Sequence, residues 1–277
     1  MKNIKLIDEK AFKRKRRDKK KEASKIQDER KHLLSQSSSF FIREAYKTMR
    51  TNVGFSLPDT DGCKVIVVTS SLQSEGKSIT AANLAISFAE ADNRVLLVDC
   101  DLRRPKLSRL FRLASPLGLS NLLLDPSLID TVILNGEHKN LEVIPAGEIP
   151  PNPSELLGSV RMKKFLEDMR KRYDYIILDT PPVNMVIDAA VVAPETDGVL
   201  FVVRSGVSER GAVIHAVEQL EYIKVKVLGF VLNGIDSESS AYRYSKYRNK
   251  SYAYRRYGYY GYRSHSHRSS AEGRRND

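Results

Sequence analysis

The sequence predicts an α/β protein built on a doubly wound, mostly parallel sheet, and three observations support this. Five short runs of Val, Ile and Leu recur along the chain, and each is nearly continuous, as in strands buried on both faces. Segments long enough for helices separate most of these runs, which is the order of βαβ units. Apolar residues make up 41% of the 277 residues, which is enough for a core.

Six segments are predicted to be strands: 64–70, 94–100, 141–147, 175–181, 198–204 and 227–233. The predicted helices between them include 76–91, 154–173 and 208–223. An earlier helix is expected to begin near Ser39, because Phe41, Ala45 and Met49 follow at helical spacing. Ligands of doubly wound sheets bind beyond the carboxyl ends of the strands, so site residues are expected there.

The net charge of +12 is concentrated at the two ends of the chain. Residues 1–31 carry 14 Lys and Arg against 6 Asp and Glu, and residues 240–277 carry 10 against 2. Both ends have little to bury, and basic ends of this kind meet acidic partners such as nucleic acid, anionic lipid or acidic protein surfaces. The sequence predicts three parts: a basic disordered arm (1–38), a globular domain that includes the early helix (39–239) and a flexible tyrosine-rich tail (240–277).

Two features bear on the compartment. No apolar run approaches the roughly 20 residues of a membrane span, and no apolar segment follows the basic N-terminus as it would in a signal peptide. The chain has two cysteines, Cys63 and Cys100, and neither belongs to a C-x-x-C motif. These features favour a reducing cytoplasmic setting.

A phosphate-binding loop is predicted between the strand at 64–70 and the helix that follows it. Gly76-Lys77-Ser78 opens the helix, so Lys77 is placed to reach the β- and γ-phosphates and the Ser78 hydroxyl to reach Mg²⁺. Ser71 stands where the usual motif has its first glycine. The residues expected to contact ATP here are Ser71, Leu72, Gln73, Ser74, Glu75, Gly76, Lys77, Ser78 and Ile79.

Three carboxylates stand at the ends of predicted strands beside this loop. Asp99 and Asp101 are alternate residues of an extended segment, so they share one face, and Asp179 ends another strand. Carboxylates placed together repel unless a cation lies near them. The Mg²⁺ of a bound nucleotide is the simplest such cation, which makes Ser78, Asp99, Asp101 and Asp179 the candidate metal-site residues.

These motifs together resemble the bacterial tyrosine kinases of capsule and exopolysaccharide systems. The resemblance rests on the phosphate loop and on "LLVDCDLRRP" (96–105), "PPNPSELL" (150–157) and "YDYIILDTPP" (173–182), in that order. It implies a P-loop NTPase of the MinD/ParA-like class that is an ATP- and Mg²⁺-dependent, non-specific protein-tyrosine kinase. Gln73 and Ser74 depart from the Pro and Gly that are common in the family.

The resemblance also implies the roles of individual residues. Lys77, Asp99, Asp101 and Asp179 are the expected catalytic residues. Asp99 would activate the tyrosine hydroxyl, while Asp101 and Asp179 would position Mg²⁺. Arg103 is expected to contact phosphate and Asn233 the adenine base. The family's E-x-x-R-x-x-R assembly motif corresponds to Glu44, Lys47 and Arg50 in this sequence, so one arginine is replaced by lysine.

The tail fits the resemblance, because it holds nine of the 13 tyrosines of the chain. The expected phosphorylation sites are Tyr242, Tyr244, Tyr247, Tyr252, Tyr254, Tyr257, Tyr259, Tyr260 and Tyr262. The family implies that the tail is phosphorylated in trans, within a ring-like homo-oligomer. It further implies a transmembrane adaptor of the polysaccharide co-polymerase type, which holds the kinase at the cytoplasmic face of the membrane, a cognate tyrosine phosphatase, and other cytoplasmic protein substrates.

Two alternatives stay open at this point. A MinD/ParA-like placement ATPase would share the fold. However, Leu72 stands where such enzymes usually carry an extra lysine, and neither their function nor their fold explains a tyrosine-rich tail. A nucleotide-switched nucleic-acid binder could stack its tail tyrosines on bases. The kinase motifs make nucleic acid the less expected partner.

Overall fold

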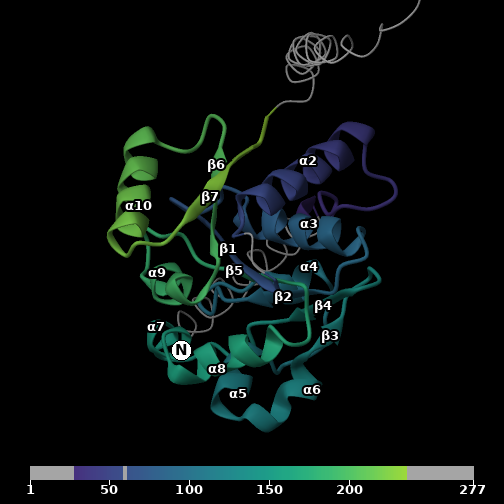
Figure 1. Ribbon diagram of the computed structural model, residues 1–277, viewed down its shortest axis with the longest axis vertical. Helices are drawn as coiled ribbons and strands as arrows, with labels where there is room; N and C mark the ends of the chain where they lie inside the picture. The colour runs from purple at the N-terminus through teal and green to yellow at the C-terminus, as the bar shows by residue number, and fades with distance from the viewer. Residues whose placement is uncertain (1–27, 59–60, 236–277) are drawn as a thin grey trace, which may run out of the picture. The chain divides into compact units, whose positions relative to one another are not determined.

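The strands assemble into one twisted sheet, and the computed structural model describes residues 28–58 and 61–235 of the chain (Figure 1). In this part of the chain the sheet has seven strands in the order β3-β4-β2-β5-β1-β6-β7. All neighbouring pairs are parallel except β3 with β4. The strands are β1 (Lys64–Ser70), β2 (Val95–Asp99), β3 (Leu134–Asn135), β4 (Leu141–Ile144), β5 (Tyr175–Asp179), β6 (Gly198–Arg204) and β7 (Val227–Asn233).

Helices connect the strands and cover both faces of the sheet, which confirms the predicted doubly wound fold. They are α2 (Phe40–Ser56), α3 (Lys77–Ala89), α4 (Leu107–Leu110), α5 (Leu119–Leu124), α6 (Ile129–Val132), α7 (Pro153–Leu157), α8 (Val160–Met169), α9 (Asp188–Val192) and α10 (Arg210–Tyr222). Two short 3₁₀ helices lie at Pro126–Leu128 and Ala193–Glu195. No helix within the described ranges is long and apolar enough to cross a membrane.

The core has two layers, one on each face of the sheet. In β1, Ile66 and Val68 pack with α2, α3 and α4, while Val65 and Val67 pack with α5, α8 and α10. All four side chains are fully buried. This explains the nearly continuous apolar runs: a strand covered on both faces has no polar side to alternate with.

Three predicted strands are shorter in the structure, at 95–99, 141–144 and 175–179, and two further details of the prediction differ. The helix expected at 154–173 is two helices, because the chain turns at Gly158 and a new helix starts with the Ser159 hydroxyl accepting the Met162 amide. The edge strand β3 is a second difference, because its two residues are too few to produce a periodic pattern. The start of α2 is as predicted, with Ser39 as its N-cap.

The segment before α2 is anchored on the domain. Leu34 is only 2% exposed, its backbone N–H donates to Asn83 Oδ1 at 2.8 Å, and Asn83 Nδ2 donates to the His32 carbonyl at 2.8 Å. Residues 28–38 were assigned above to the disordered arm, so the structure corrects that part of the assignment. This anchor has no periodic pattern, because it consists of two adjacent leucines, Leu33 and Leu34, inside a polar stretch. The remaining arm lies outside the described residues.

We expect Leu34→Ala to lower the free energy of unfolding by about 2–4 kcal/mol, because the substitution leaves a cavity in the layer over α3. Phe41→Ala is the matched control, since Phe41 is 61% exposed and should change stability by less than about 0.5 kcal/mol. Urea titrations of the two full-length variants make the comparison. Equal small losses would mean that the segment does not stay bound in solution.

Candidate active site

The predicted phosphate loop joins β1 to α3 at the carboxyl edge of the sheet. Gly76 ends the loop in the left-handed region at φ +98°, and Ser74 also has a positive φ of +67°. Asn233, at the end of β7, donates from Nδ2 to the Glu75 carbonyl at 3.0 Å. A Cβ on Gly76 would lie 1.9 Å from that Nδ2 atom, so only glycine fits here.

Glu75 holds the loop in shape from inside. Its buried carboxylate accepts from the Ser71 hydroxyl and from the Leu72 amide, both at 2.7 Å, and also from the Ser208 hydroxyl. Ser208 lies just before α10, so the carboxylate ties the loop to a distant part of the chain. Ser71, Leu72 and Glu75 were expected at the nucleotide, whereas Ser208 was not predicted, because no motif singles it out.

Two exposed arginines hold the loop from outside. Arg104 donates to Gln73 Oε1 at 2.7 Å, and Arg204 donates to the Ser74 carbonyl at 2.8 Å. Gln73 and Ser74 are the two positions that depart from the Pro and Gly of the family. The arginines therefore supply contacts at the place where the loop sequence is least typical.

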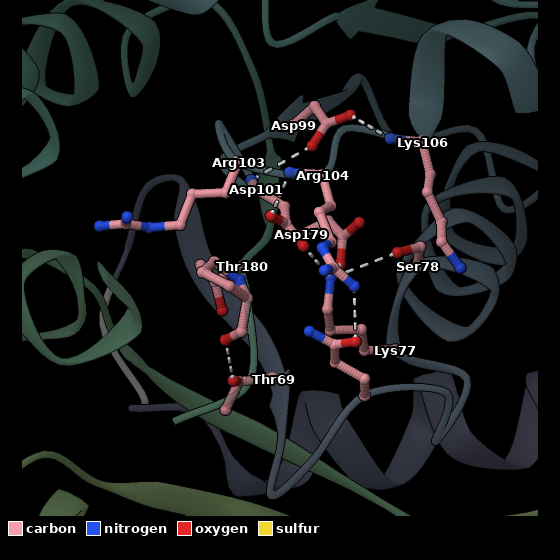
Figure 2. A network of polar contacts seen from close by, with 12 residues as sticks. Thr69, Lys77, Ser78, Asp99, Asp101, Arg103, Arg104, Lys106, Asp179 and Thr180 are labelled. Carbon is pink, nitrogen blue, oxygen red and sulfur yellow. Dashed lines mark hydrogen bonds and ion pairs between the residues drawn. The ribbon is translucent and has the colours of Figure 1, made fainter. Parts of the chain in front are cut away.

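Two of the three expected carboxylates, Asp101 and Asp179, come together around Lys77 (Figure 2). Lys77 Nζ lies 2.9 Å from Asp101 Oδ2 and 3.3 Å from Asp179 Oδ1. Its pKa would fall on burial, but the charges of Asp179 and Asp101 raise it above the usual value. Lys77 is therefore a permanent cation. Ser78 lies beside it in the first turn of α3, with its hydroxyl 3.4 Å from Nζ, and Ile79 follows, half-buried.

Asp99 is placed differently from its two companions. It pairs in register with Asp179 across β2 and β5, yet both its oxygens accept backbone N–H groups. Oδ1 accepts from Asp101 at 3.2 Å, while Oδ2 accepts from Lys106 and Leu107 at 3.0 Å each. Complete burial and the charge of Asp179 raise the pKa of Asp99 to about 7. This carboxyl therefore shapes the loop after β2 and does not reach toward Lys77.

The oxygens around Lys77 suit a hard cation. Asp179 is fully buried, burial raises its pKa, and within the described residues its Oδ2 atom has no hydrogen-bond partner. Asp101 and the Ser78 hydroxyl supply further oxygen ligands beside it. In the described part of the chain, no three or more His, Cys, Asp or Glu side chains come together as a metal-binding group. Mg²⁺ is normally held by one or two carboxylates together with substrate phosphates, so the donor set fits this ion.

Arg103 turns away from this cluster (Figure 2). Its guanidinium makes a two-pronged ion pair with the buried Asp188, at 2.9 and 3.0 Å, and donates to the Ser154 hydroxyl at 3.0 Å. Ser154 in turn donates to Asp188 at 2.7 Å. The structure thus joins the loop after β2 to α7 and α9 through Arg103. Asp188 and Ser154 were missed because they are far from Arg103 in the sequence.

The three expected assembly residues divide into two groups on α2. Lys47 Nζ pairs with Glu44 at 2.8 Å along the helix surface. Arg50 instead turns inward and donates to the Ser87 carbonyl of α3. Glu44 and Lys47 remain exposed or half-exposed, whereas Arg50 already has an intramolecular partner. The nine expected phosphorylation sites lie outside the described residues.

Comparisons with known proteins identify the family of this chain. A family model described as an AAA domain matches residues 63–226. Tyrosine-protein kinase YwqD of Bacillus subtilis (strain 168) is 41% identical over 202 residues, which span 73% of this chain and 85% of the relative. The kinase domain of the Escherichia coli tyrosine kinase ETK superposes with a TM-score of 0.67 at 35% identity, covering 70% of this chain and 76% of that one.

Two further structures complete the comparison. The chimerical protein CapA2B2 superposes with a TM-score of 0.69 at 38% identity, covering 73% of this chain and 88% of that one. The Pyrococcus furiosus cell division ATPase MinD shares the fold at 23% identity, with a TM-score of 0.52 over 61% of this chain and 71% of its own. The fold is thus MinD-like, as expected, and the chain belongs to the AAA domain family and, within it, to the bacterial tyrosine-protein kinases.

Proposed function

We propose that this chain is an ATP-dependent protein-tyrosine kinase that phosphorylates the tyrosine cluster of its own tail, with one copy acting on another. One observation carries the proposal: Lys77 of the phosphate loop lies within 3.3 Å of two carboxylates at adjacent strand ends, in a chain with nine clustered tyrosines. The kinase relatives favour this function over the placement ATPase and the nucleic-acid binder.

The transfer joins the tyrosine oxygen to the γ-phosphorus, breaks its bond to the bridging oxygen and leaves ADP. Lys77 would donate to the phosphate oxygens and spread their charge. Mg²⁺, when bound by Ser78, Asp101 and Asp179 together with the phosphates, supplies further charge neutralisation. The tyrosine hydroxyl, with an ordinary pKa of about 10, needs a nearby base.

Asp101 is better placed than Asp99 to take that proton. Asp101 presents Oδ2 to Lys77 at 2.9 Å, whereas both oxygens of Asp99 accept backbone N–H groups. We therefore revise the role that family resemblance gave to Asp99: it positions the loop that carries Asp101. Asn233 Nδ2 donates to the backbone carbonyl of Glu75 in the loop. Its proposed contact with adenine would be made in addition to this hydrogen bond.

The tail gives the reaction a consequence. Residues 240–277 carry a net charge of +8, and each phosphotyrosine adds about −1.5 to −2. Full phosphorylation would reverse the sign of the tail, so a tail attracted to an acidic site would leave it, and the ring-like oligomer would loosen. We place this cycle in capsular or exopolysaccharide synthesis and chain-length control. A transmembrane adaptor would recruit and activate the kinase at the membrane, and a tyrosine phosphatase would reset the tail.

Mass spectrometry of the full chain tests the proposal. The protein is incubated with Mg-ATP, with and without the cytoplasmic peptide of a candidate adaptor, beside a Lys77→Met control. We expect several phosphates on residues 242–262 and none in the control. ATP turnover with an unmodified tail would instead identify a placement ATPase. Salt-dependent binding of oligonucleotides by the unmodified tail, without any phosphate transfer, would favour the nucleic-acid binder.

A further inference from the structure

A shallow apolar groove lies outside the phosphate site, at the same carboxyl edge of the sheet. Its volume is about 540 Å³, and it runs between the end of α5, the loop after β4 and the first turn of α8. Its lining includes Leu124, Pro150, Pro151, Glu155, Leu156 and Val160. Another cavity, of about 580 Å³, is lined by residues that include Arg94 and Tyr173, at the amino ends of β2 and β5, and is therefore remote from the phosphate loop.

The groove exposes apolar side chains that the domain leaves uncovered. Val160 is 82% exposed and Leu124 is 63% exposed, and two prolines also line the groove. Arg161 is the one cation in the lining, and its guanidinium donates to the Leu123 carbonyl at 3.1 Å. Exposed apolar surface that lies together in a groove marks a binding site for another molecule.

A short chain of contacts links the groove to the reacting centre. Glu155 lines the groove, and the adjacent Ser154 donates to Asp188 and accepts from Arg103 at 3.0 Å. Arg103 follows Asp101 by two residues, and Asp101 holds Lys77. A peptide with one tyrosine at Lys77 would therefore leave the site next to α7, where the groove begins.

We propose that this groove binds a second tyrosine of the substrate tail, residues 242–262 of another copy, while a first tyrosine occupies the phosphate site. The inference rests on the proposed function and deepens it by adding a substrate-binding site. Neighbouring tyrosines of the tail are one to five residues apart, so one stretch presents several rings. A tyrosine ring brings a large apolar surface and keeps its hydroxyl in water at the open side of a shallow groove.

Charge also favours this occupant. Residues 242–262 contain six Lys and Arg and no Asp or Glu. Exposed acidic residues stand around the groove: Glu155 lines it, Asp125 follows Leu124, and Glu148 precedes Pro150 by two residues. Arg161 keeps its positive charge while it donates to backbone carbonyls, but the three acidic side chains outnumber it. The groove thus offers apolar contact to the rings and opposite charge to the residues between them.

The test uses two distinguishable full-length chains. The substrate is the Lys77→Met chain labelled with ¹⁵N, and the enzyme is wild type or Val160→Lys. We expect Val160→Lys to raise the KM for the labelled chain about tenfold while kcat and the KM for ATP change less than about twofold. Val160→Asp should raise KM less, because it removes the apolar contact but adds a charge opposite to that of the tail. Tyr222→Lys, at a position 89% exposed on α10, should change nothing.

Val160→Lys is next placed in the labelled substrate chain instead of the enzyme. This experiment distinguishes binding of a tail in the groove from a contact between two folded domains. We expect no effect there, because only the enzyme's groove receives a tail. An equal rise in KM from either chain would overturn the proposal in favour of domain–domain contact. An unchanged KM, or a fall in kcat alone, would overturn it as well. If wild type transfers no phosphate to the labelled chain, the proposed function fails first, and the role of the groove with it.

Discussion

Gly76→Ala is expected to weaken nucleotide binding by about a hundredfold while leaving the rest of the fold in place. The new Cβ would lie 1.9 Å from Asn233 Nδ2, and alanine at φ +98° costs roughly 1–3 kcal/mol in backbone strain. The loop would have to move away from Asn233 and release the Glu75 carbonyl. Because phosphate binding depends on the backbone N–H groups of this loop, the affinity for ADP should fall with it.

Calorimetric titration with Mg-ADP measures the loss, and two variants separate its causes. Gly206→Ala places alanine at φ +69° with no atom within 4 Å of the new Cβ, so it carries backbone strain without the clash. Adding Asn233→Ala to Gly76→Ala removes the clash but not the strain, and should recover part of the affinity. Equal affinities for Gly76→Ala and wild type would show that the loop takes another shape when nucleotide binds.

Asp99→Asn and Asp101→Asn are expected to fail in different ways. In Asp99→Asn an amide NH₂ must face backbone N–H groups that now donate to a carboxylate, which should cost about 2–4 kcal/mol of unfolding free energy. In Asp101→Asn the Oδ1 atom can still accept from the Arg104 amide, and Asp179 still pairs with Lys77. Its amide NH₂ would face the Lys77 ammonium, so that variant should also lose about 1–3 kcal/mol, but in addition it should lower phosphate transfer by about 10²–10⁴.

Denaturant unfolding and a phosphotransfer assay on both full-length variants check this contrast. Ser120→Ala is a useful stability control, because it removes a buried hydroxyl that donates to a backbone carbonyl far from Lys77. A stable but inactive Asp99→Asn, together with an active Asp101→Asn, would return the proton-accepting role to Asp99.

The sequence was sufficient for those features that depend on local pattern. The strands at 64–70, 198–204 and 227–233 have the predicted bounds. The first two are largely buried, and buried parallel strands leave continuous apolar runs, whereas the strand at 227–233 is a partly exposed edge strand that is still rich in apolar residues. The grouping of Lys77, Asp101 and Asp179 followed from topology, since adjacent parallel strands end at one edge.

What could not be predicted depends on contacts between distant residues. Glu75 meets Ser208, and Arg103 meets Asp188, across 133 and 85 positions of the chain. Neither pair belongs to a motif or repeats with a period. The burial of Leu34 is similar, because two adjacent leucines in a polar stretch give no periodic signal. The turn of Asp99 toward the backbone also depends on the path of the loop at 100–106, which the aspartate spacing does not specify.

Helix α3 has two tasks at its two ends. It begins at Lys77 in the phosphate loop, and near its other end the Ser87 carbonyl accepts from Arg50 of α2. If α2 joins copies together, α3 connects the assembly surface to the nucleotide site. Thermodynamic reciprocity then applies to the two equilibria. If assembly raises the affinity for nucleotide by some factor, bound nucleotide must raise the affinity of the copies for one another by the same factor. If ATP and ADP couple to α2 by different factors, their ratio in the cell would set the degree of assembly.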